Sequence, residues 1–424
     1  MSVYFVDNIN GNNNNDGLSE LTPVIDEASL NIVAGDTVLF KRGNFYRRKL
    51  ESISGESGKP ITYGAYGEGE KPIFCGSVSL DSREDWYQEE KNIWVCDKID
   101  NDEAGNIVYN NSESFGTLRW TKSELSEQGD FFDNCFGYRE QKLKITGHKV
   151  YIYSEKNPAD YYNSIECVVY GKRNLANNGK NINFENLKFQ NSGVHALSGE
   201  GESRNINVAN CDFENIGGCV WNAELKIRYG NGIEFWNVAE NITVHNCRFC
   251  NIYDSAVTHQ GGKDCDTAKQ FIIEDNLFVK CGMAAYEQRD RMTVNSRFNN
   301  NICVDAGEGF SKQGEIMPRR SEIWPQPMGH HVFLWRIKEP SENGGLEIKN
   351  NIFCNAPYGA AIYSIISEDA ENQINIEGNT YFTKNTSLLN RLHGKNYALY
   401  SEYTEKNSKY EVLDGKNLIE NISY

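Results

Sequence analysis

The 424-residue sequence predicts an all-β fold, a right-handed parallel β-helix, and three observations carry this prediction. An eleven-residue motif, N-I-x-I-x-N-x-x-F-x-N, recurs from residue 181 onward. Apolar residues alternate within each copy, which is the periodicity of strands. Asparagines stand at fixed positions where the chain must turn. Such units bury their inward side chains only by stacking on neighbours about 4.8 Å away, which makes the chain a solenoid.

The copies differ in spacing, which locates the turns that carry insertions. Successive starts lie 24, 36, 29, 25, 50 and 28 residues apart. A unit of about 24 residues fits one coil with three short strands. Stacked coils should place asparagine ladders at the sixth and eleventh positions, a phenylalanine stack at the ninth, and Cys211 above Cys247. A leucine-rich repeat is excluded because the leucine pattern it requires is missing.

The whole chain, residues 1–424, is assigned to a single β-helix domain. Residues 1–75 should form an N-terminal cap and the first coils. Within them, a short amphipathic helix at residues 25–33 should cover the open end of the solenoid. Residues 76–170 lose the period and are expected to form irregular coils or inserted strands. The regular coils occupy residues 181–382, and the polar residues 383–424 form a C-terminal cap or tail.

Composition narrows the class of partner. Lys and Arg total 43 against 59 Asp and Glu, a net charge of −16, which argues against nucleic acid or an anionic membrane surface. No apolar run reaches the roughly 18 residues of a membrane helix. The first residues lack a signal-peptide pattern, so we expect a cytoplasmic protein or a secreted one whose signal peptide has been removed. The twelve cysteines show no zinc-finger spacing, so we expect reduced, buried thiols and no metal site.

Several stretches carry a resemblance to a known superfamily. YFVDNINGNNNNDGLSELTP, AGDTVLFKRG, SGKPITYGAYGEGEKPI and the NIxIxN coils resemble the pectate-lyase-like right-handed β-helix superfamily. QGDFFD, VYIYSEKNPADYYNSIE, RYGNGIEFW and NIYDSAVTHQG resemble its glycoside hydrolase branch, which includes β-helix xylosidases and fucosidases. The resemblance covers nearly the whole chain. It implies a glycoside hydrolase that cleaves a plant or microbial polysaccharide or its oligosaccharides.

Two long insertions point to the position of the site. Residues 217–232 and 313–340 flank the same central coils, and long loops on one side of a solenoid are the usual walls of a binding site. They favour a pocket over an open groove, and hence exo action. Aligning the central coils places Glu234, Thr258, Glu287 and Lys312 in one outward-facing column.

Glu234 is the first candidate for a catalytic carboxylate. Glu287, two coils away, would have its Cα atom roughly 9.6 Å distant, which suits the ~6.5–9.5 Å separation of an inverting glycosidase. Asp254, one coil below, could approach to about 5 Å and suit a retaining mechanism. β-Helix xylosidases carry an Asp/Glu pair one coil apart, but Glu234 and Asp254 run in the opposite order, so roles are not transferred. The residues expected to bind substrate are Arg228, Asn231, Trp236, His259, Gln260, Tyr286, Arg289 and Lys312.

Two other functions stay open at this stage. A polysaccharide lyase acting on a uronic-acid polymer would use Lys312 as base and Ca²⁺ held by Asp264 and Asp266, whereas hydrolysis needs no cofactor. A non-catalytic carbohydrate-binding β-helix would keep the aromatic residues without a carboxylate pair. Asp254 could instead form an Asx-turn, and His330 and His331 could be incidental loop residues. Association into a homo-oligomer through the side faces is compatible with the sequence, but no such face is identified.

Overall fold

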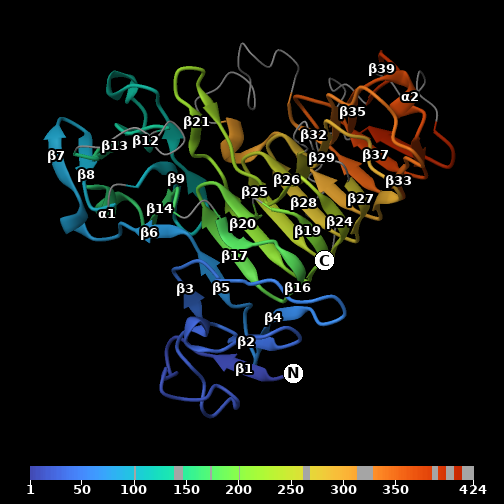
Figure 1. The fold of residues 1–424 in the computed structure, drawn as a ribbon. Coiled ribbons are helices and arrows are strands. Elements are labelled where there is room, and N and C mark those ends of the chain that lie inside the picture. Colours follow the sequence, from blue (N-terminus) through green and yellow to red (C-terminus); the bar gives the residue numbers. More distant parts are fainter. Residues whose placement is uncertain are drawn as a thin grey trace.

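The computed structural model describes residues 1–99, 102–137, 147–171, 174–199, 201–260, 268–312, 328–383, 390–397 and 405–412. These residues form a right-handed parallel β-helix with an inserted group of strands (Figure 1). The proposed calcium ligands Asp264 and Asp266 lie outside the described residues, as do Arg319, Arg320 and Trp324 of the second long loop. Within the described ranges, no helix has the length and apolar character needed to cross a membrane.

Three parallel sheets form the walls of the solenoid. The first contains β1 (Val3–Val6), β2 (Thr37–Lys41), β4 (Ile61–Tyr66), β16 (Lys180–Glu185), β19 (Ser203–Ala209), β24 (Ala239–His245), β27 (Ala268–Glu274), β30 (Ser296–Asn299), β33 (Leu346–Lys349) and β36 (Ile374–Glu377). The second contains β3 (Phe45–Tyr46), β5 (Ile73–Cys75), β17 (Lys188–Ser192), β20 (Asp212–Ile216), β25 (Arg248–Ile252), β28 (Leu277–Cys281), β31 (Ile302–Val304), β34 (Ile352–Cys354), β37 (Thr380–Thr383) and β40 (Lys409–Val412).

The third sheet carries the candidate site. Its strands are β15 (Asn174–Asn177), β18 (His195–Ser198), β23 (Ile233–Trp236), β26 (Ser255–Gln260), β29 (Ala284–Arg289), β32 (His330–Trp335), β35 (Ile362–Ile365), β38 (Asn390–Leu392) and, antiparallel at the edge, β39 (Lys395–Tyr397). From β16 to β38 each coil thus contributes one strand to each sheet, as the repeat predicts.

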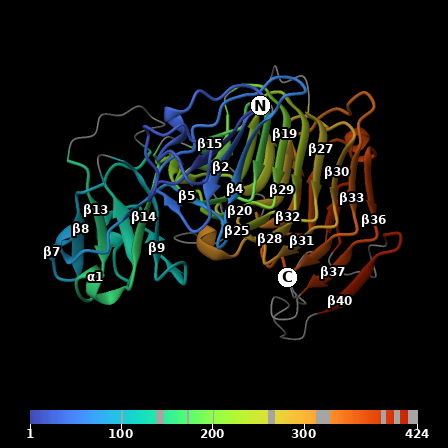
Figure 2. The same cartoon turned by 90° about the horizontal axis from the view of Figure 1, so that it is seen from below.

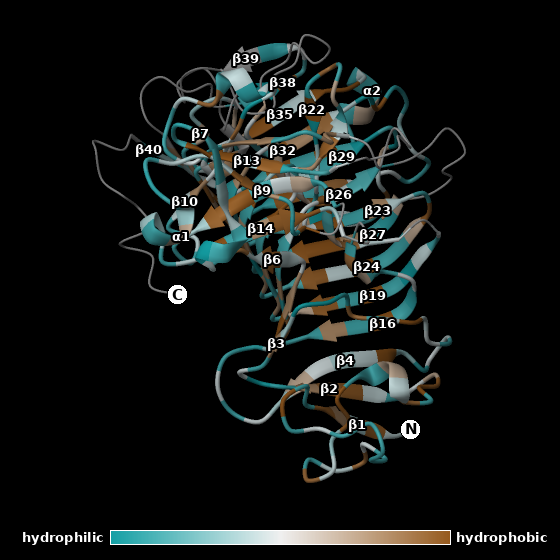
Figure 3. Cartoon of the chain, turned by 90° about the vertical axis from the view of Figure 1, so that its left-hand side faces the viewer, coloured by the Kyte–Doolittle hydropathy of each residue, from teal (hydrophilic) through white to brown (hydrophobic). Residues whose placement is uncertain are grey.

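Strand register confirms the repeat. Ile182 pairs with Ile206 and Ile206 with Ile242, the equivalent positions of successive copies. Along β16, β19 and β24 buried and more exposed residues alternate, and the hydropathy of the same strands alternates with them (Figure 3). The alternation turns one set of side chains into the solenoid, where they form a continuous apolar core.

The expected phenylalanine stack is confirmed. The ring of Phe213 lies between those of Phe189 and Phe249, with centroids 5.4 and 4.5 Å away, and the stack continues to Phe278 at 5.0 Å from Phe249. The four rings are close to parallel, so each fills the space left between two coils. The stack therefore fixes the axial register of the second sheet.

The asparagines serve the corners in two ways. At the eleventh position Asn215 donates its side-chain amide to Asn191 at 3.0 Å, and Asn251 donates to Asn215 at 3.3 Å, which is the expected ladder. At the sixth position the expected ladder does not form among the described residues. Asn186, Asn210 and Asn246 there adopt φ values of +52° to +58°, a left-handed backbone that the eleventh-position asparagines share. A further buried amide ladder lies one residue later: Asn276, Asn301, Asn351 and Asn379.

Residues 77–169 leave the solenoid and return to it. They form two small sheets with their own apolar core, and they flank the coils (Figures 1 and 2). One sheet is antiparallel and contains β6 (Ser77–Ser79), β9 (Ala104–Tyr109), β10 (Ser114–Phe115) and β14 (Ile165–Val169). The other contains β7 (Tyr87–Glu90), β8 (Ile93–Cys96), β11 (Thr117–Leu118), β12 (Asp130–Asp133) and β13 (Val150–Tyr153).

The N-terminal helix is shorter than predicted. Within residues 25–33 only the 3-10 turn η1 (Glu27–Ser29) forms, because Leu30 returns to an extended backbone and packs with Ile32 against the solenoid core. The other short elements are η2 (Arg83–Asp85), η3 (Lys122–Glu124), α1 (Pro158–Tyr161), the hairpin β21 (Val220–Asn222) and β22 (Ile227–Arg228), η4 (Gly309–Lys312) and α2 (Glu368–Glu371). The eleven described cysteines form no disulfide.

Candidate active site

The central strands of the third sheet have the predicted register as far as Glu287. Glu234 on β23 pairs with Thr258 on β26, which pairs with Glu287 on β29. The next partner is wrong in the sequence-based alignment, because Glu287 pairs with Phe333 on β32 and not with Lys312. In that coil the chain forms the 3-10 helix η4, which ends at Lys312, and the strand follows only after the long loop. After Glu287 the outward column continues with two aromatic residues, Phe333 and Tyr363, before it reaches Arg391 on β38.

A pocket of about 190 Å³ lies over these strands. Glu234 and Asp254 both line it, and each residue is 6% exposed. Other polar lining residues are Asn231, Gln260 and Arg289. The aromatic lining residues are Trp221, Tyr229, Trp236 and Trp335. Two carboxylates thus open into one partly apolar pocket, which is the arrangement that general acid–base chemistry on a sugar requires.

Glu234 is held by polar contacts on both carboxylate oxygens. The hydroxyl of Ser198 donates to Oε2 at 2.9 Å, and Nε2 of His195 lies 2.9 Å from the same oxygen. The side-chain amide of Asn231 donates to Oε1 at 3.3 Å. Nδ1 of His195 accepts the backbone N–H of Asn231, so a neutral imidazole carries its proton on Nε2, toward the carboxylate.

Asp254 occupies the corner before β26, one coil from Glu234. Its backbone N–H donates to the carbonyl of Gly230 at 3.0 Å. The next residue, Ser255, donates its N–H to Oδ1 of Asn231 at 3.0 Å, while the amide nitrogen of that same side chain contacts Glu234. Asn231 therefore connects the strands that carry the two carboxylates and fixes their relative position.

Glu287 lies behind the pocket and does not line it. Its side chain is fully buried, and its carboxylate accepts hydrogen bonds from Trp335 Nε1 at 2.7 Å, Thr258 Oγ1 at 2.8 Å and Ser255 Oγ at 3.0 Å. Burial raises the pKa of Glu287, with the nearby charge of Asp254 adding to the effect and Arg289 opposing it. The structure therefore brings Glu234 together with Asp254 rather than with Glu287 at the pocket surface.

Arg228 lies outside the pocket, contrary to the expectation that it lines the subsites. It is buried, its Nε donates to the carbonyl of Gly218 at 2.7 Å, and its Nη2 donates to the carbonyl of Gly105 at 2.8 Å. Its guanidinium also stacks over the ring of Tyr253, 4.5 Å from the centroid. Because Gly105 belongs to the inserted strands, Arg228 joins the insertion to the solenoid.

His259 and Tyr286 also lie outside the pocket, because strand alternation turns them inward. His259 is buried, with Nε2 2.8 Å from the carbonyl of Asn237, and burial lowers its pKa to about 4. Tyr286 donates its hydroxyl to Gln288 at 2.7 Å and stacks on Phe298. The same alternation places Thr258 and Glu287 outward, so the rule that finds the carboxylates excludes these two residues.

The structure adds residues that the sequence analysis missed. Ser198 and His195 contact Glu234 from β18, and Leu197 pairs with Ile233, so extending the alignment by one coil would have placed Ser198 beside Glu234. Trp221 and Tyr229 come from the hairpin region that the first long insertion forms. His330 and His331 are buried away from the pocket, and burial lowers the pKa of His331 to about 3.

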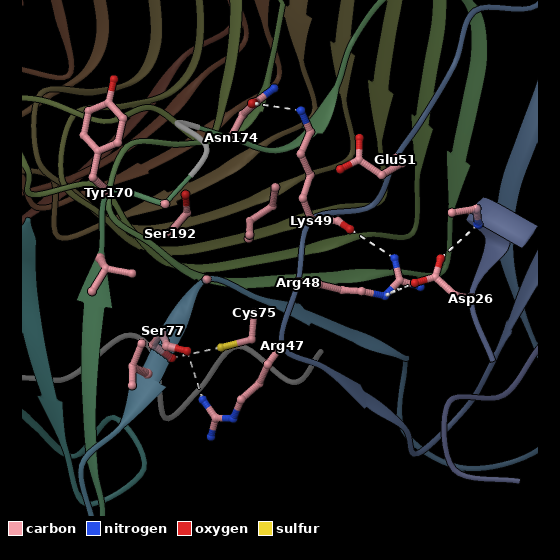
Figure 4. A pocket seen from close by; sticks show the side chains of 16 residues that line it. Asp26, Arg47, Arg48, Lys49, Glu51, Cys75, Ser77, Tyr170, Asn174 and Ser192 are labelled. Atoms are coloured by element: carbon pink, nitrogen blue, oxygen red, sulfur yellow. Dashed lines mark hydrogen bonds and ion pairs between the residues drawn. The ribbon is translucent and has the colours of Figure 1, made fainter. Parts of the chain in front are cut away.

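A second, larger pocket of about 470 Å³ lies between the first coils and the insertion (Figure 4). Three consecutive basic residues line it. Arg47 pairs with Glu166 at 2.6 Å, Arg48 pairs with Glu27, and Lys49 donates to Asn177 at 3.0 Å. These contacts connect the first coils to the insertion and the third sheet, and the pocket does not contain the Glu234–Asp254 pair.

Comparisons with known proteins bear on the fold. No family model matches the chain, and no curated protein is similar to it. Among solved structures, XylC in complex with xylose matches with a TM-score of 0.54 and 12% identity over 97% of this chain. The chain spans 65% of the length of XylC. The likeness to XylC and the three parallel sheets confirm the β-helix fold.

Two further structures are similar at lower scores. The GH136 lacto-N-biosidase from Eubacterium ramulus matches with a TM-score of 0.47 and 14% identity, covering 97% of this chain and 68% of that protein. Pectate lyase Pel9A matches with a TM-score of 0.46 and 13% identity, covering 97% of this chain and 77% of that protein.

Proposed function

We propose that the protein is a glycoside hydrolase in which Glu234 and Asp254 are the catalytic carboxylates. The observation that carries the proposal is that both side chains line one pocket, one coil apart, beside exposed tryptophans. The β-helix fold shared with XylC, a protein solved in complex with xylose, supports a carbohydrate substrate.

The contacts of the two carboxylates support different roles. Glycoside hydrolysis needs one carboxylic acid that protonates the leaving oxygen and one carboxylate that acts as nucleophile or as base for water. Glu234 accepts hydrogen bonds from Ser198 and Asn231 and lies 2.9 Å from His195 Nε2. These contacts stabilise negative charge, so Glu234 takes the role of the ionised partner. Asp254 is then the proton donor.

The walls of the pocket supply the contacts that hold a sugar. Trp221 is 46% exposed and Trp236 is 41% exposed, and both present aromatic surface to the pocket. Aromatic faces bind the apolar faces of sugar rings, while Arg289 and Gln260 offer hydrogen bonds to hydroxyl groups. This lining suits a neutral saccharide and leaves the carboxylates directed at its glycosidic oxygen.

The test is product analysis on a panel of neutral and uronic polysaccharides and aryl glycosides. A hydrolase releases reducing ends without forming the ultraviolet-absorbing unsaturated sugar of a lyase reaction. Glu234→Gln and Asp254→Asn should each lower kcat/KM by about 10²- to 10⁴-fold. The matched control is Glu224→Gln, an exposed carboxylate on the turn of the adjacent hairpin, which should keep wild-type activity.

Other outcomes assign the protein elsewhere. Unsaturated products that require Ca²⁺ and persist in Glu234→Gln would identify a lyase. Its expected base, Lys312, does not occupy the column position in which the sequence analysis placed it. Saccharide binding by calorimetry without turnover on any substrate, unchanged in Glu234→Gln, would identify a binding module.

A further inference from the structure

The insertion contains a cluster of metal-ligating side chains that does not line the pocket of the carboxylate pair. Asp133 ends β12, Cys135 follows two residues later, and His148 precedes β13, with which β12 pairs. One ligand atom from each of the three residues lies within 4.8 Å of the others. Asp133 and His148 are buried and Cys135 is half-buried. The cluster thus places a nitrogen, a sulfur and an oxygen ligand atom where β12 ends and β13 begins.

The contacts inside the cluster resemble a coordination set more than a simple ion pair. Nε2 of His148 lies 3.0 Å from both carboxylate oxygens of Asp133. Each of these oxygens also accepts one backbone N–H at 2.7 Å, from Cys135 and from Ala104, which orients the carboxylate. Backbone donors of this kind fix ligating carboxylates in metal sites. Nδ1 of His148 is buried and has no hydrogen-bond partner among the described residues, so the imidazole is incompletely satisfied as it stands.

The charge around the cluster favours a cation. A second carboxylate, Glu103, is fully buried nearby, and its oxygens accept the backbone N–H groups of Gly137 and Val220. Two neighbouring buried carboxylates are costly unless positive charge compensates them. A divalent ion bound by Asp133 would supply that charge where His148 alone supplies at most one.

We propose that Asp133, Cys135 and His148 bind a transition-metal ion of the zinc class. Thiolate and imidazole are the ligands that select zinc over calcium or magnesium, which take oxygen ligands. The three side chains leave one position of a tetrahedral site for water or a further ligand. This site is distinct from the oxygen-ligand calcium site that a lyase would need.

The position of the cluster gives the ion a structural role. It fixes the two chain segments at one end of the β12–β13 pair, and Glu103 extends the contacts from there to the backbone of Val220. Val220 precedes Trp221, which lines the carboxylate pocket. A bound ion would therefore hold the insertion against the pocket wall, and this inference does not depend on the reaction catalysed.

Cobalt and zinc binding to the full chain test the proposal. After treatment with chelator, titration with Co²⁺ should give about one ion per chain, with visible bands of a tetrahedral site and a thiolate-to-cobalt charge-transfer band. Elemental analysis after zinc loading and gel filtration should find the same stoichiometry, and zinc should raise the Tm. Cys135→Ser should lose the charge-transfer band and His148→Gln should weaken binding at least tenfold. The matched control is Cys250→Ser, a second half-buried cysteine on β25, which should bind as wild type.

Two results would overturn the proposal. Wild-type protein that binds no cobalt or zinc in these titrations refutes it without reference to any variant. A charge-transfer band that persists in Cys135→Ser, with folding verified by circular dichroism, or that is lost equally in Cys250→Ser, places the metal elsewhere. If Cys135→Ser does not fold, His148→Gln and the wild-type stoichiometry decide the question.

Discussion

Replacing Trp335 by Phe tests whether Glu287 is a buried carboxylate held by the pocket wall. The change removes the indole N–H that donates to Glu287 at 2.7 Å and leaves Arg289, 3.9 Å away, near that oxygen. A hydrogen bond to a charged group contributes about 1.5–3 kcal/mol to stability. The smaller phenyl ring adds a packing loss of about 1 kcal/mol that does not depend on pH. We expect a total loss of about 3 kcal/mol in the free energy of unfolding at pH 8.

The pH dependence separates the hydrogen bond from the packing loss. Burial raises the pKa of Glu287 above its unfolded value, so this group contributes stability below the unfolded pKa and loses it as pH rises through the folded pKa. The indole N–H lowers that folded pKa, and removing it raises the pKa further. The stability difference between Trp335→Phe and wild type should therefore grow from about 1–2 kcal/mol at pH 5 to the full value at pH 8.

Urea unfolding at pH 5 and pH 8 measures both values. The matched control is the same substitution in a Glu287→Gln background. Residue 287 then has no carboxylate to titrate, so only the pH-independent loss should remain. An equal loss at the two pH values in the Glu287 background would refute this account of the buried carboxylate. A loss below about 0.5 kcal/mol at pH 8 would refute the hydrogen bond itself.

Three further predictions concern the scaffold. Phe213→Ala removes a ring stacked between Phe189 and Phe249 and should cost about 3–5 kcal/mol by urea unfolding, whereas a loss under 1 kcal/mol contradicts the stack. Burial lowers the pKa of His259 to about 4, so the free energy of unfolding of the wild type should fall as the pH drops from 6.5 to 4. His259→Gln should show a smaller fall in that free energy. An equal fall in the variant would contradict the lowered pKa of His259. Arg228→Met should cost about 2–4 kcal/mol and speed proteolysis of the insertion, and unchanged proteolysis would show that Arg228 does not hold it.

The fold was predictable because the repeat encodes its own register. A β-helix places equivalent residues of successive coils side by side, so the spacing of the copies gives the strand pairing directly, as with Ile206 and Ile242. The sequence analysis left residues 76–170 open between irregular coils and inserted strands. The pairing of these strands could not be predicted, because they pair with one another rather than with equivalent positions of the repeat. The short N-terminal turn was also missed, since an amphipathic pattern over residues 25–33 does not reveal that Leu30 leaves the helix for the core.

The site was predictable only where the repeat is intact. Glu234 and Glu287 follow from strand alternation, and their shared column is observed. Lys312 was misplaced because the strand of that coil in the third sheet follows the long loop instead of preceding it. The sequence does not show on which side of the loop that strand lies. His195 and the cluster around Asp133 bring together residues from separate strands or loop ends, and no local pattern marks them.

The outward column of the third sheet carries two carboxylates, Glu234 and Glu287, within three successive coils. Ser198 adjoins Glu234 on one side, and on the other side the column passes from Glu287 to Phe333. Phe333 belongs to an apolar cluster that also contains Trp335 and Tyr363, so the column carries aromatic side chains on two coils before Arg391 pairs with Tyr363. Under the proposed function, a substrate on this face would meet Glu234 and Asp254 between Ser198 and this apolar cluster, with tryptophans beside them. This short polar stretch beside apolar side chains fits the proposed action on a few sugar rings, because small-ligand pockets combine apolar walls with a few placed polar groups.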